Sequence, residues 1–343
     1  MYHGKTLVVT LCMHRSGSSL TSHLMHRLGM SLGPFELLGP SETNKFGYFE
    51  ATPIVELNKE VQRQVLGFVG DMPTSPAMLQ SLCDCSGRWE CDQAVLEPAL
   101  QRAEELLRQL VDSAPISGFK DPRVPLLWPF WQQVFARFPG LRVVPLFLLR
   151  SPHEIAMSLF MRGEGRLAYR DALDVVAVHF QRMLAIRNAC DSACGVIRFD
   201  TQAFPDDARR AAELVGLPWC DQLLAELYDP HSKHHEPAVV AHPAQDVFER
   251  LCGHSPRERT LKDLARLEAD ALVRERLLQK RLLEANRRAE RIDSELVATY
   301  AEITRLNKVV GDQNYEAELI KSSRVWKARE RLVGGLKIIG VKR

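Results

Sequence analysis

The chain has 343 residues, of which 45% are hydrophobic and 26% charged, and its formal net charge is +2 at pH 7. That length is enough for one domain of about 200 to 250 residues with an appendage. No apolar run is long enough to span a bilayer, and the N-terminus lacks the charged-then-apolar pattern of a signal peptide. The eight cysteines stand in ordinary contexts, so we expect a cytoplasmic protein in a reducing compartment.

The N-terminal segment predicts a buried strand, a loop and a helix. The apolar run Leu7–Cys12 precedes a loop rich in glycine and serine, and leucines at helical spacing follow from residue 20 to 28. Such a loop directs backbone N–H groups and the positive end of a helix dipole at one place, which favours a phosphate. Gly17 permits close approach of the backbone, Ser18 and Ser19 add hydroxyl donors, and Arg15 adds a fixed positive charge. The loop is not a Walker A motif, because it lacks that motif's first glycine and its lysine. The alternative to a phosphate-binding loop is a strand-to-helix turn that binds no ligand.

The following residues alternate between helical and strand patterns. Helices are predicted at 54–65 and 92–111 and from about residues 152 and 171, and strands near 116, near 146 and at 196–199. Pro145 lacks a ladder donor, so we expect the regular part of its strand to begin near Leu146. Alternation of this kind predicts an α/β domain with a central parallel sheet in three layers, whose ligands bind at the carboxyl ends of the strands.

Basic residues follow three of the predicted strands. Arg15, Lys120 and Arg150 each come just after a strand end, which predicts that they share one site. Beyond Arg150, the order Ser151, Pro152, Glu154 predicts a helix that begins with a capping box. Ser158 then lies almost two turns inside this helix, either as a functional hydroxyl or as a small packing residue.

Three of these blocks resemble the sulfotransferases that use 3′-phosphoadenosine-5′-phosphosulfate (PAPS) as donor. Residues 15–19 read Arg-Ser-Gly-Ser-Ser, like that family's 5′-phosphosulfate loop, although Ser18 stands where Thr is more common. Arg150 and Ser158 have the spacing of the arginine and serine that bind the 3′-phosphate. Residues 120–122 are similar to a Lys-Asp-Pro element of several branches, and 198–200 and 215–218 echo a weaker block. The resemblance covers about residues 5 to 220 and is weakest between 35 and 118, where little beyond 47–50 matches.

The resemblance implies an enzyme that transfers a sulfuryl group from PAPS to a hydroxyl or amine, without a metal. Lys120 would stabilise charge on the transferring group, and Arg150 and Ser158 would bind the 3′-phosphate. Arg123 would serve either the acceptor or the donor, and the alternative is a surface ion pair with Asp121 or a nearby acid. The residues implied to bind the 5′-phosphosulfate are His14, Arg15, Ser16, Gly17, Ser18 and Ser19. The implied acceptor is a carbohydrate or glycolipid.

The resemblance implies that the catalytic base is either a Glu in the segment after the first helix or a His. Glu50 is the first candidate, since it ends the run Gly47-Tyr48-Phe49, where burial would raise its pKa. Glu36 is the second candidate. Glu42 also lies in this region, and His14 is a further alternative.

After residue 255 the sequence changes character. Leu282, Ala285, Ala289, Ile292, Leu296, Thr299, Ile303, Leu306 and Val310 follow 4-3 spacing, which predicts a coiled coil and a homo-oligomer through 261–310. The alternative is a single long helix packed on the domain. We therefore expect a sulfotransferase domain at 1–255, a coiled coil at 256–320 and a basic amphipathic tail at 321–343.

The tail has eight basic residues and one acidic residue, interleaved with apolar ones. This pattern suits the anionic inner face of a membrane, although a solvated tail is the alternative. No motif supports nucleic-acid binding. The cysteines at 83, 85 and 91 and the histidines at 231, 234, 235 and 242 lack zinc spacing, so no metal is expected.

Two other functions remain open, namely a kinase that uses ATP through an altered P-loop and an inactive coiled-coil scaffold.

Overall fold

The computed structural model describes residues 2–40, 44, 47–67, 93–162, 168–190, 193–199, 202–229, 238–253 and 261–338. Contacts divide the chain into two units, Met1–Arg276 and Leu277–Arg343. Several predictions concern residues outside the described ranges. They are those on Glu42, Cys83, Cys85, Cys91, Asp200, His231, His234, His235 and residues 339–343.

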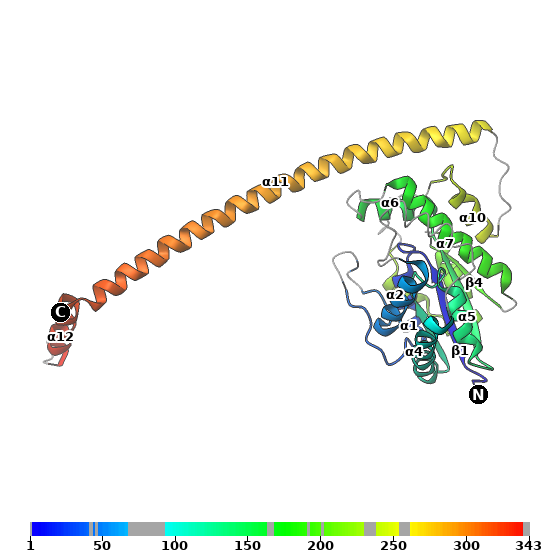
Figure 1. Ribbon diagram of the computed structural model, residues 1–343, viewed down its shortest axis with the longest axis horizontal. Coiled ribbons are helices and arrows are strands. Elements are labelled where there is room, and N and C mark those ends of the chain that lie inside the picture. Colours follow the sequence, from blue (N-terminus) through cyan, green and yellow to red (C-terminus); the bar gives the residue numbers. More distant parts are fainter. Residues whose placement is uncertain are drawn as a thin grey trace. The chain divides into compact units, whose positions relative to one another are not determined.

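The first unit contains a four-stranded parallel sheet (Figure 1). Its strands are β1 (Thr6–Cys12), β2 (Ile116–Lys120), β3 (Arg142–Leu149) and β4 (Gly195–Arg198), in the spatial order β2-β1-β3-β4. All seven residues of β1 are buried, as its apolar sequence predicts. The predicted α/β class with a parallel sheet is confirmed.

Helices separate the strands in the sequence. Before β2 come α1 (Ser18–Arg27), α2 (Thr52–Leu66) and α4 (Gln93–Asp112), and before β3 comes α5 (Trp128–Ala136). Then come α6 (Pro152–Arg162), α7 (Tyr169–Ala189), α8 (Phe204–Val215), α9 (Asp221–Leu227) and α10 (Pro243–Leu251). The expected helix boundaries differ from these by only a few residues, which is ordinary for helix ends.

Helices cover both faces of the sheet, so the unit has three layers. On one face Val8 and Leu146 belong to a buried cluster with Leu24 of α1 and Ala208 of α8. On the other face the ring of Phe119 lies 4.7 Å from that of Trp131 in α5. Neighbouring residues of a strand point to opposite faces, and this alternation sends the strand side chains into two separate cores.

The strand order reverses at β1, because β2 lies on one side of it and β3 and β4 on the other. In open α/β sheets, ligands bind outside the carboxyl ends of the strands at such a reversal. The residues that follow β1 and β3 there are the glycine- and serine-rich loop and Arg150. The topology thus brings together two segments 135 residues apart in the sequence.

Two local predictions need correction. β3 begins at Arg142 and includes Pro145, whereas the sequence predicted a regular strand only from Leu146. On the side of β4, pairing begins at Leu146, so the missing N–H of Pro145 breaks no hydrogen bond to that strand. The capping box at α6 does not form. Glu154 instead accepts hydrogen bonds from the Arg150 Nε and Nη2 atoms, at 3.1 and 2.8 Å.

The second unit contains α12 (Arg324–Ile338) and the greater part of α11 (Leu261–Ser322). In α11 the predicted seam residues Ile292, Leu296 and Ile303 are 62%, 51% and 47% exposed. In α12 the Arg329 guanidinium lies 5.0 Å from the centre of the Trp326 ring. The coiled coil, the homo-oligomer and the membrane contact stay predictions.

Within the described residues, no helix combines the length and the apolar character that a membrane crossing needs.

A buried histidine on α7 predicts how stability depends on pH. His179 is 3% exposed, its Nδ1 lies 2.8 Å from the Val175 carbonyl, and burial lowers its pKa to about 4. Between that value and its ordinary pKa near 6.5, the unfolded chain binds a proton that the folded chain does not. The stability that neutral His179 contributes is therefore complete above about pH 6.5 and is lost as the pH falls toward 4.

We expect His179→Gln to reduce the loss of stability on acidification by up to about 1.4 kcal/mol per pH unit between pH 6.5 and 4. The amide can still donate to Val175 but does not titrate. Urea unfolding of both proteins at several pH values measures the two slopes. Equal slopes would show that His179 is not the group responsible.

Candidate functional site

The loop after β1 has an unusual backbone. Gly17 is the N-cap of α1 with φ 84°, and Arg15 has φ 67° although it carries a side chain. No side chain caps the first turn of α1, so its N–H groups remain donors. Ser18, Ser19 and Leu20 of this turn line a cavity. The uncapped N-terminus of α1 therefore lies at a cavity wall.

Phe199, just after β4, fills the space above Gly17. A Cβ atom built on Gly17 would lie only 2.4 Å from the Phe199 ring. The Arg150 guanidinium lies 5.7 Å from the centre of the same ring. Only glycine fits at position 17, both for its positive φ and for the approach of this ring.

The cavity beside the loop has a volume of about 550 Å³. It brings together residues from the ends of β1, β2 and β3, as the common placement of their basic residues predicts. Predicted site residues that line it are His14, Arg15, Gly17, Ser18, Ser19, Glu50, Lys120 and Arg150. Residues 225–229, in and after α9, form part of its wall.

Arg15, Arg150 and Ser158 are linked to one another. The Arg15 Nε donates to the Ser158 Oγ at 2.7 Å, and the Arg150 Nη1 donates to the Arg15 carbonyl at 3.0 Å. The Arg150 side chain is only 12% exposed, and Glu154 balances its charge. Ser158 does not itself line the cavity, but it fixes the direction of the Arg15 guanidinium.

Two loop serines make contacts that the sequence does not indicate. The Ser16 hydroxyl is fully buried and donates to the Met13 carbonyl at 2.7 Å, so it holds the loop in shape and does not reach the cavity. The Ser19 hydroxyl accepts a hydrogen bond from the Asn44 amide at 3.0 Å. Of the three serines predicted to contact an anion, Ser18 and Ser19 line the cavity and Ser16 does not.

Glu50 and Lys120 form a buried ion pair at the cavity. The Lys120 Nζ lies 2.5 Å from the Glu50 Oε1, and the two residues are 2% and 6% exposed. The pair places a carboxylate and an ammonium group side by side at the cavity wall. The pairing of these two predicted catalytic residues is not visible in the sequence, where they stand 70 positions apart.

The other base candidates have different surroundings. Glu36 is exposed on a loop and is not among the residues that line the cavity. His14 lines the cavity, as does His23, whose ring is stacked at 4.3 Å on Phe49. Burial and the nearby Arg27 and His26 lower the pKa of His23, which keeps it neutral near pH 7. Among the predicted carboxylates in the described residues, Glu50 is the one that lies at the cavity.

A buried polar network behind the ion pair was missed from the sequence. Asp121, fully buried, accepts hydrogen bonds from Asn58 and from the backbone and side chain of Arg123, all at 2.9 Å. The Trp131 indole donates to the Asn58 oxygen at 3.0 Å. Burial and the nearby charge of Glu50 raise the pKa of Asp121. The predicted alternative for Arg123, an ion pair with Asp121, is therefore present, but it is buried and not on the surface. A polar residue on the buried face of α2 was the sequence signal for Asn58.

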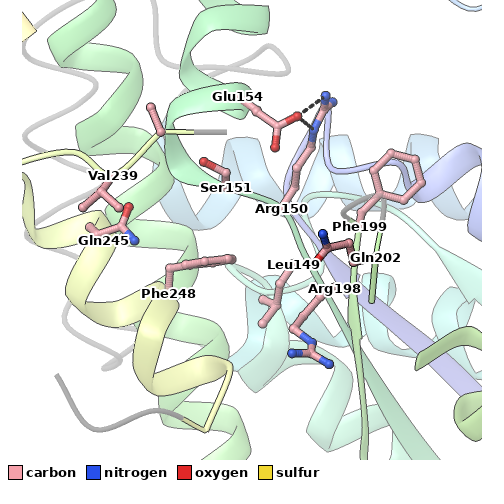
Figure 2. A pocket seen from close by; sticks show the side chains of 11 residues that line it. Leu149, Arg150, Ser151, Glu154, Arg198, Phe199, Gln202, Val239, Gln245 and Phe248 are labelled. Atoms are coloured by element: carbon pink, nitrogen blue, oxygen red, sulfur yellow. Dashed lines mark hydrogen bonds and ion pairs between the residues drawn. The ribbon is translucent and has the colours of Figure 1, made fainter. Parts of the chain in front are cut away.

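Arg150 also borders a second cavity of about 400 Å³ (Figure 2). Figure 2 shows Arg150 and Glu154 at one end, Arg198 and Gln202 nearby, and Gln245 and Phe248 of α10 on the opposite wall. Phe199 lines both cavities. The Arg150 and Phe199 side chains therefore separate two spaces at the carboxyl ends of β3 and β4.

No protein-family profile matches the sequence, and no curated protein does. Among solved structures, a sulfotransferase domain from the curacin biosynthetic pathway is 14% identical, with a TM-score of 0.41 over 78% of this chain and 97% of that one. A sulfotransferase domain from the Synechococcus olefin synthase is 15% identical, with a TM-score of 0.37 over 78% and 95%. A Mycobacterium tuberculosis sulfotransferase is 13% identical, with a TM-score of 0.39 over 73% and 77%.

The contact between Gly17 and Phe199 predicts a large cost for a single methyl group. We expect Gly17→Ala to lower the free energy of unfolding by more than the roughly 1 kcal/mol typical of an alanine at positive φ, because the ring must also move. Gly67→Ala is the matched control, since Gly67 has φ 71° with nothing within 4 Å of its Cβ position. Urea unfolding compares the two variants. Equal losses would mean that the ring gives way without cost.

Proposed function

We propose that the chain is a sulfotransferase that moves a sulfuryl group from PAPS to an acceptor hydroxyl or amine. One observation carries the proposal. The basic residues Arg15, Lys120 and Arg150, from three strand ends, line one cavity together with the carboxylate Glu50. PAPS carries phosphate at both ends of its ribose and a sulfuryl group on one of them, and this arrangement of charges suits that donor.

The residues present fit the two anionic ends of the donor. The uncapped first turn of α1, with Ser18, Ser19 and Arg15, offers neutral and charged donors for the 5′-phosphosulfate. Arg150, oriented by Glu154 and by the Arg15 carbonyl, would bind the 3′-phosphate. Ser158 would act on the donor through Arg15, because its hydroxyl already accepts from the Arg15 Nε.

The transfer requires one base and charge stabilisation. The bond between sulfur and the 5′-phosphate oxygen breaks, a new bond forms between sulfur and the acceptor oxygen or nitrogen, and the acceptor proton passes to Glu50. The products are the sulfated acceptor and 3′,5′-adenosine bisphosphate. Lys120, which lies 2.5 Å from Glu50, would stabilise the transferring group while Glu50 takes the proton.

We further propose that the acceptor is a carbohydrate or a glycolipid. The cavity wall combines flat aromatic groups, Tyr48 and Phe49, with the carboxylates Glu226 and Asp229. Aromatic faces pack against the apolar face of a sugar ring, and carboxylates accept hydrogen bonds from its hydroxyl groups. These features support a polyhydroxylated acceptor over a purely apolar one.

Calorimetric titration with 3′,5′-adenosine bisphosphate, ATP and ADP tests the donor. We expect the bisphosphate to bind more tightly than ATP or ADP, because ATP and ADP lack a 3′-phosphate that Arg150 could bind. Arg150→Ala should weaken this binding by about 1.5–3 kcal/mol, the range of a hydrogen bond to a charged group. Arg102→Ala is the control, since Arg102 lies on the surface and pairs with Glu60.

Each other outcome of this titration excludes the proposed function. Preference for ATP with Mg²⁺ would instead support a kinase. Binding of none of the three nucleotides would instead support a scaffold.

The base is tested by comparing two carboxylates. We expect Glu50→Gln to lower transfer from labelled PAPS to a panel of sugars by about 100-fold or more, the scale of a general base. Binding of the bisphosphate should persist in this variant, because the glutamine amide oxygen can still accept the hydrogen bond from Lys120 and Glu50 does not contact the predicted phosphate ligands. Glu36→Gln should keep its activity. Loss of activity in Glu36→Gln alone would exclude Glu50 as the base.

A further inference from the structure

The second unit presents an apolar stripe along one face of α11. We call the residues at positions a and d of its heptads, from 292 to 320, the seam. They are Ile292, Leu296, Thr299, Ile303, Leu306, Val310, Gln313, Ala317 and Ile320, all of them exposed. Ile292, Leu296, Val310 and Ile320 are each more than half exposed. Isolated apolar residues are common on surfaces, but a stripe at 4-3 spacing needs a partner with the same period.

We propose that the seam binds the seam of a second copy of this chain, parallel and in register, as a two-stranded coiled coil. The apolar residues at its centre support two strands. Ile303 and Val310 occupy a positions and Leu306 the d position between them, which is the combination that favours a parallel dimer.

The charges beside the seam support parallel strands in register. In that arrangement each g residue faces the e residue five positions later in the other chain. Glu316 then faces Lys321 of the second copy. The other pairs from 295 to 314 each contain a residue without charge, so no like charges meet.

Other arrangements lose this pairing. A slip of one heptad places Glu316 opposite Asn314 or a residue of α12. In an antiparallel dimer, g residues of one chain face g residues of the other. If the residues from 292 to 320 form the middle of such a dimer, the glutamates at g positions 295, 302 and 316 bring like charges together.

Two polar seam residues favour the same register. Thr299 and Gln313 sit at d positions among apolar neighbours. In register each meets its own copy, and two hydroxyl or amide groups can bond to each other. After a slip of one heptad, Gln313 would face Leu306 or Ile320 and leave its amide without a partner, which is costly in a buried layer.

Within one chain, Lys321 forms only an exposed ion pair. The Lys321 Nζ lies 3.1 Å from Glu318, and these side chains are 57% and 74% exposed. A surface ion pair of this kind contributes little, so Lys321 can exchange Glu318 for Glu316 of a second copy.

Sedimentation equilibrium of the full chain at micromolar concentration tests the assembly. We expect twice the 38.8 kDa mass of one chain. Ile303→Asp should weaken association by at least about 100-fold, because it places two carboxylates in an apolar layer. Val297→Asp is the matched control. Val297 is 69% exposed on α11 but occupies a b position away from the seam, so this variant should remain a dimer.

A charge exchange tests the orientation. Glu316→Lys and Lys321→Glu each create like-charge pairs in a parallel homodimer, whereas a mixture of the two variants restores opposite charges in both pairs. We expect each variant alone to dimerise about fivefold more weakly, and the mixture to form heterodimers as strong as the wild-type dimer. No recovery on mixing would overturn the parallel arrangement.

Other results would overturn the dimer itself. A wild-type monomer, a trimer, or equal loss in Ile303→Asp and Val297→Asp would each do so. So would a monomer that sediments with anionic vesicles through Ile303, since the seam would then cover lipid. None of these measurements depends on nucleotide binding, so they remain decisive if the proposed function fails.

Discussion

The site depends on how the loop after β1 is tied to the end of β3. The Arg150 guanidinium donates to the Arg15 carbonyl, and the Arg15 side chain donates to Ser158 in α6. These bonds support Arg15 at φ 67°, a conformation that residues with side chains seldom adopt. Because β1 and β3 are adjacent and buried, the two arginines are held by rigid elements rather than by their own surface loops. A phosphate entering here would meet donors that are already oriented, which lowers the entropic cost of binding.

Buried charge is the second constraint on this region. Lys120 and Asp121 follow each other at the end of β2, and each is almost fully buried. They point to different partners, Lys120 to Glu50 and Asp121 to Asn58 and Arg123. Removing one member would leave an uncompensated charge, which is strongly destabilising. The network therefore fixes the position of Glu50 beside the cavity, and the conformation of the segment before α2 depends on charges contributed by β2.

The fold and the strand–loop–helix unit after β1 could be predicted from the sequence because both depend on local patterns. Short apolar runs, turn residues and helical spacing located the strands and helices, and the placement of Arg15, Lys120 and Arg150 after strands indicated a shared cavity. What the sequence could not show are contacts between distant residues of ordinary type. Phe199 against Gly17 and Trp131 on Asn58 depend on packing, and Glu154 prefers a nearby guanidinium to the helix cap that its spacing suggests. Pro145 was tolerated because of where β4 begins, which is a property of the sheet and not of β3.

The ion pair between Glu50 and Lys120 is the place where the proposed function would join donor and acceptor chemistry. The Lys120 ammonium group faces the Glu50 carboxylate inside a buried site. Under the proposed function, an anionic sulfuryl group placed near Lys120 would compete with Glu50 for the ammonium group, because both carry negative charge. Donor binding and proton transfer would then act on the same buried pair, whose two members stand 70 positions apart in the sequence.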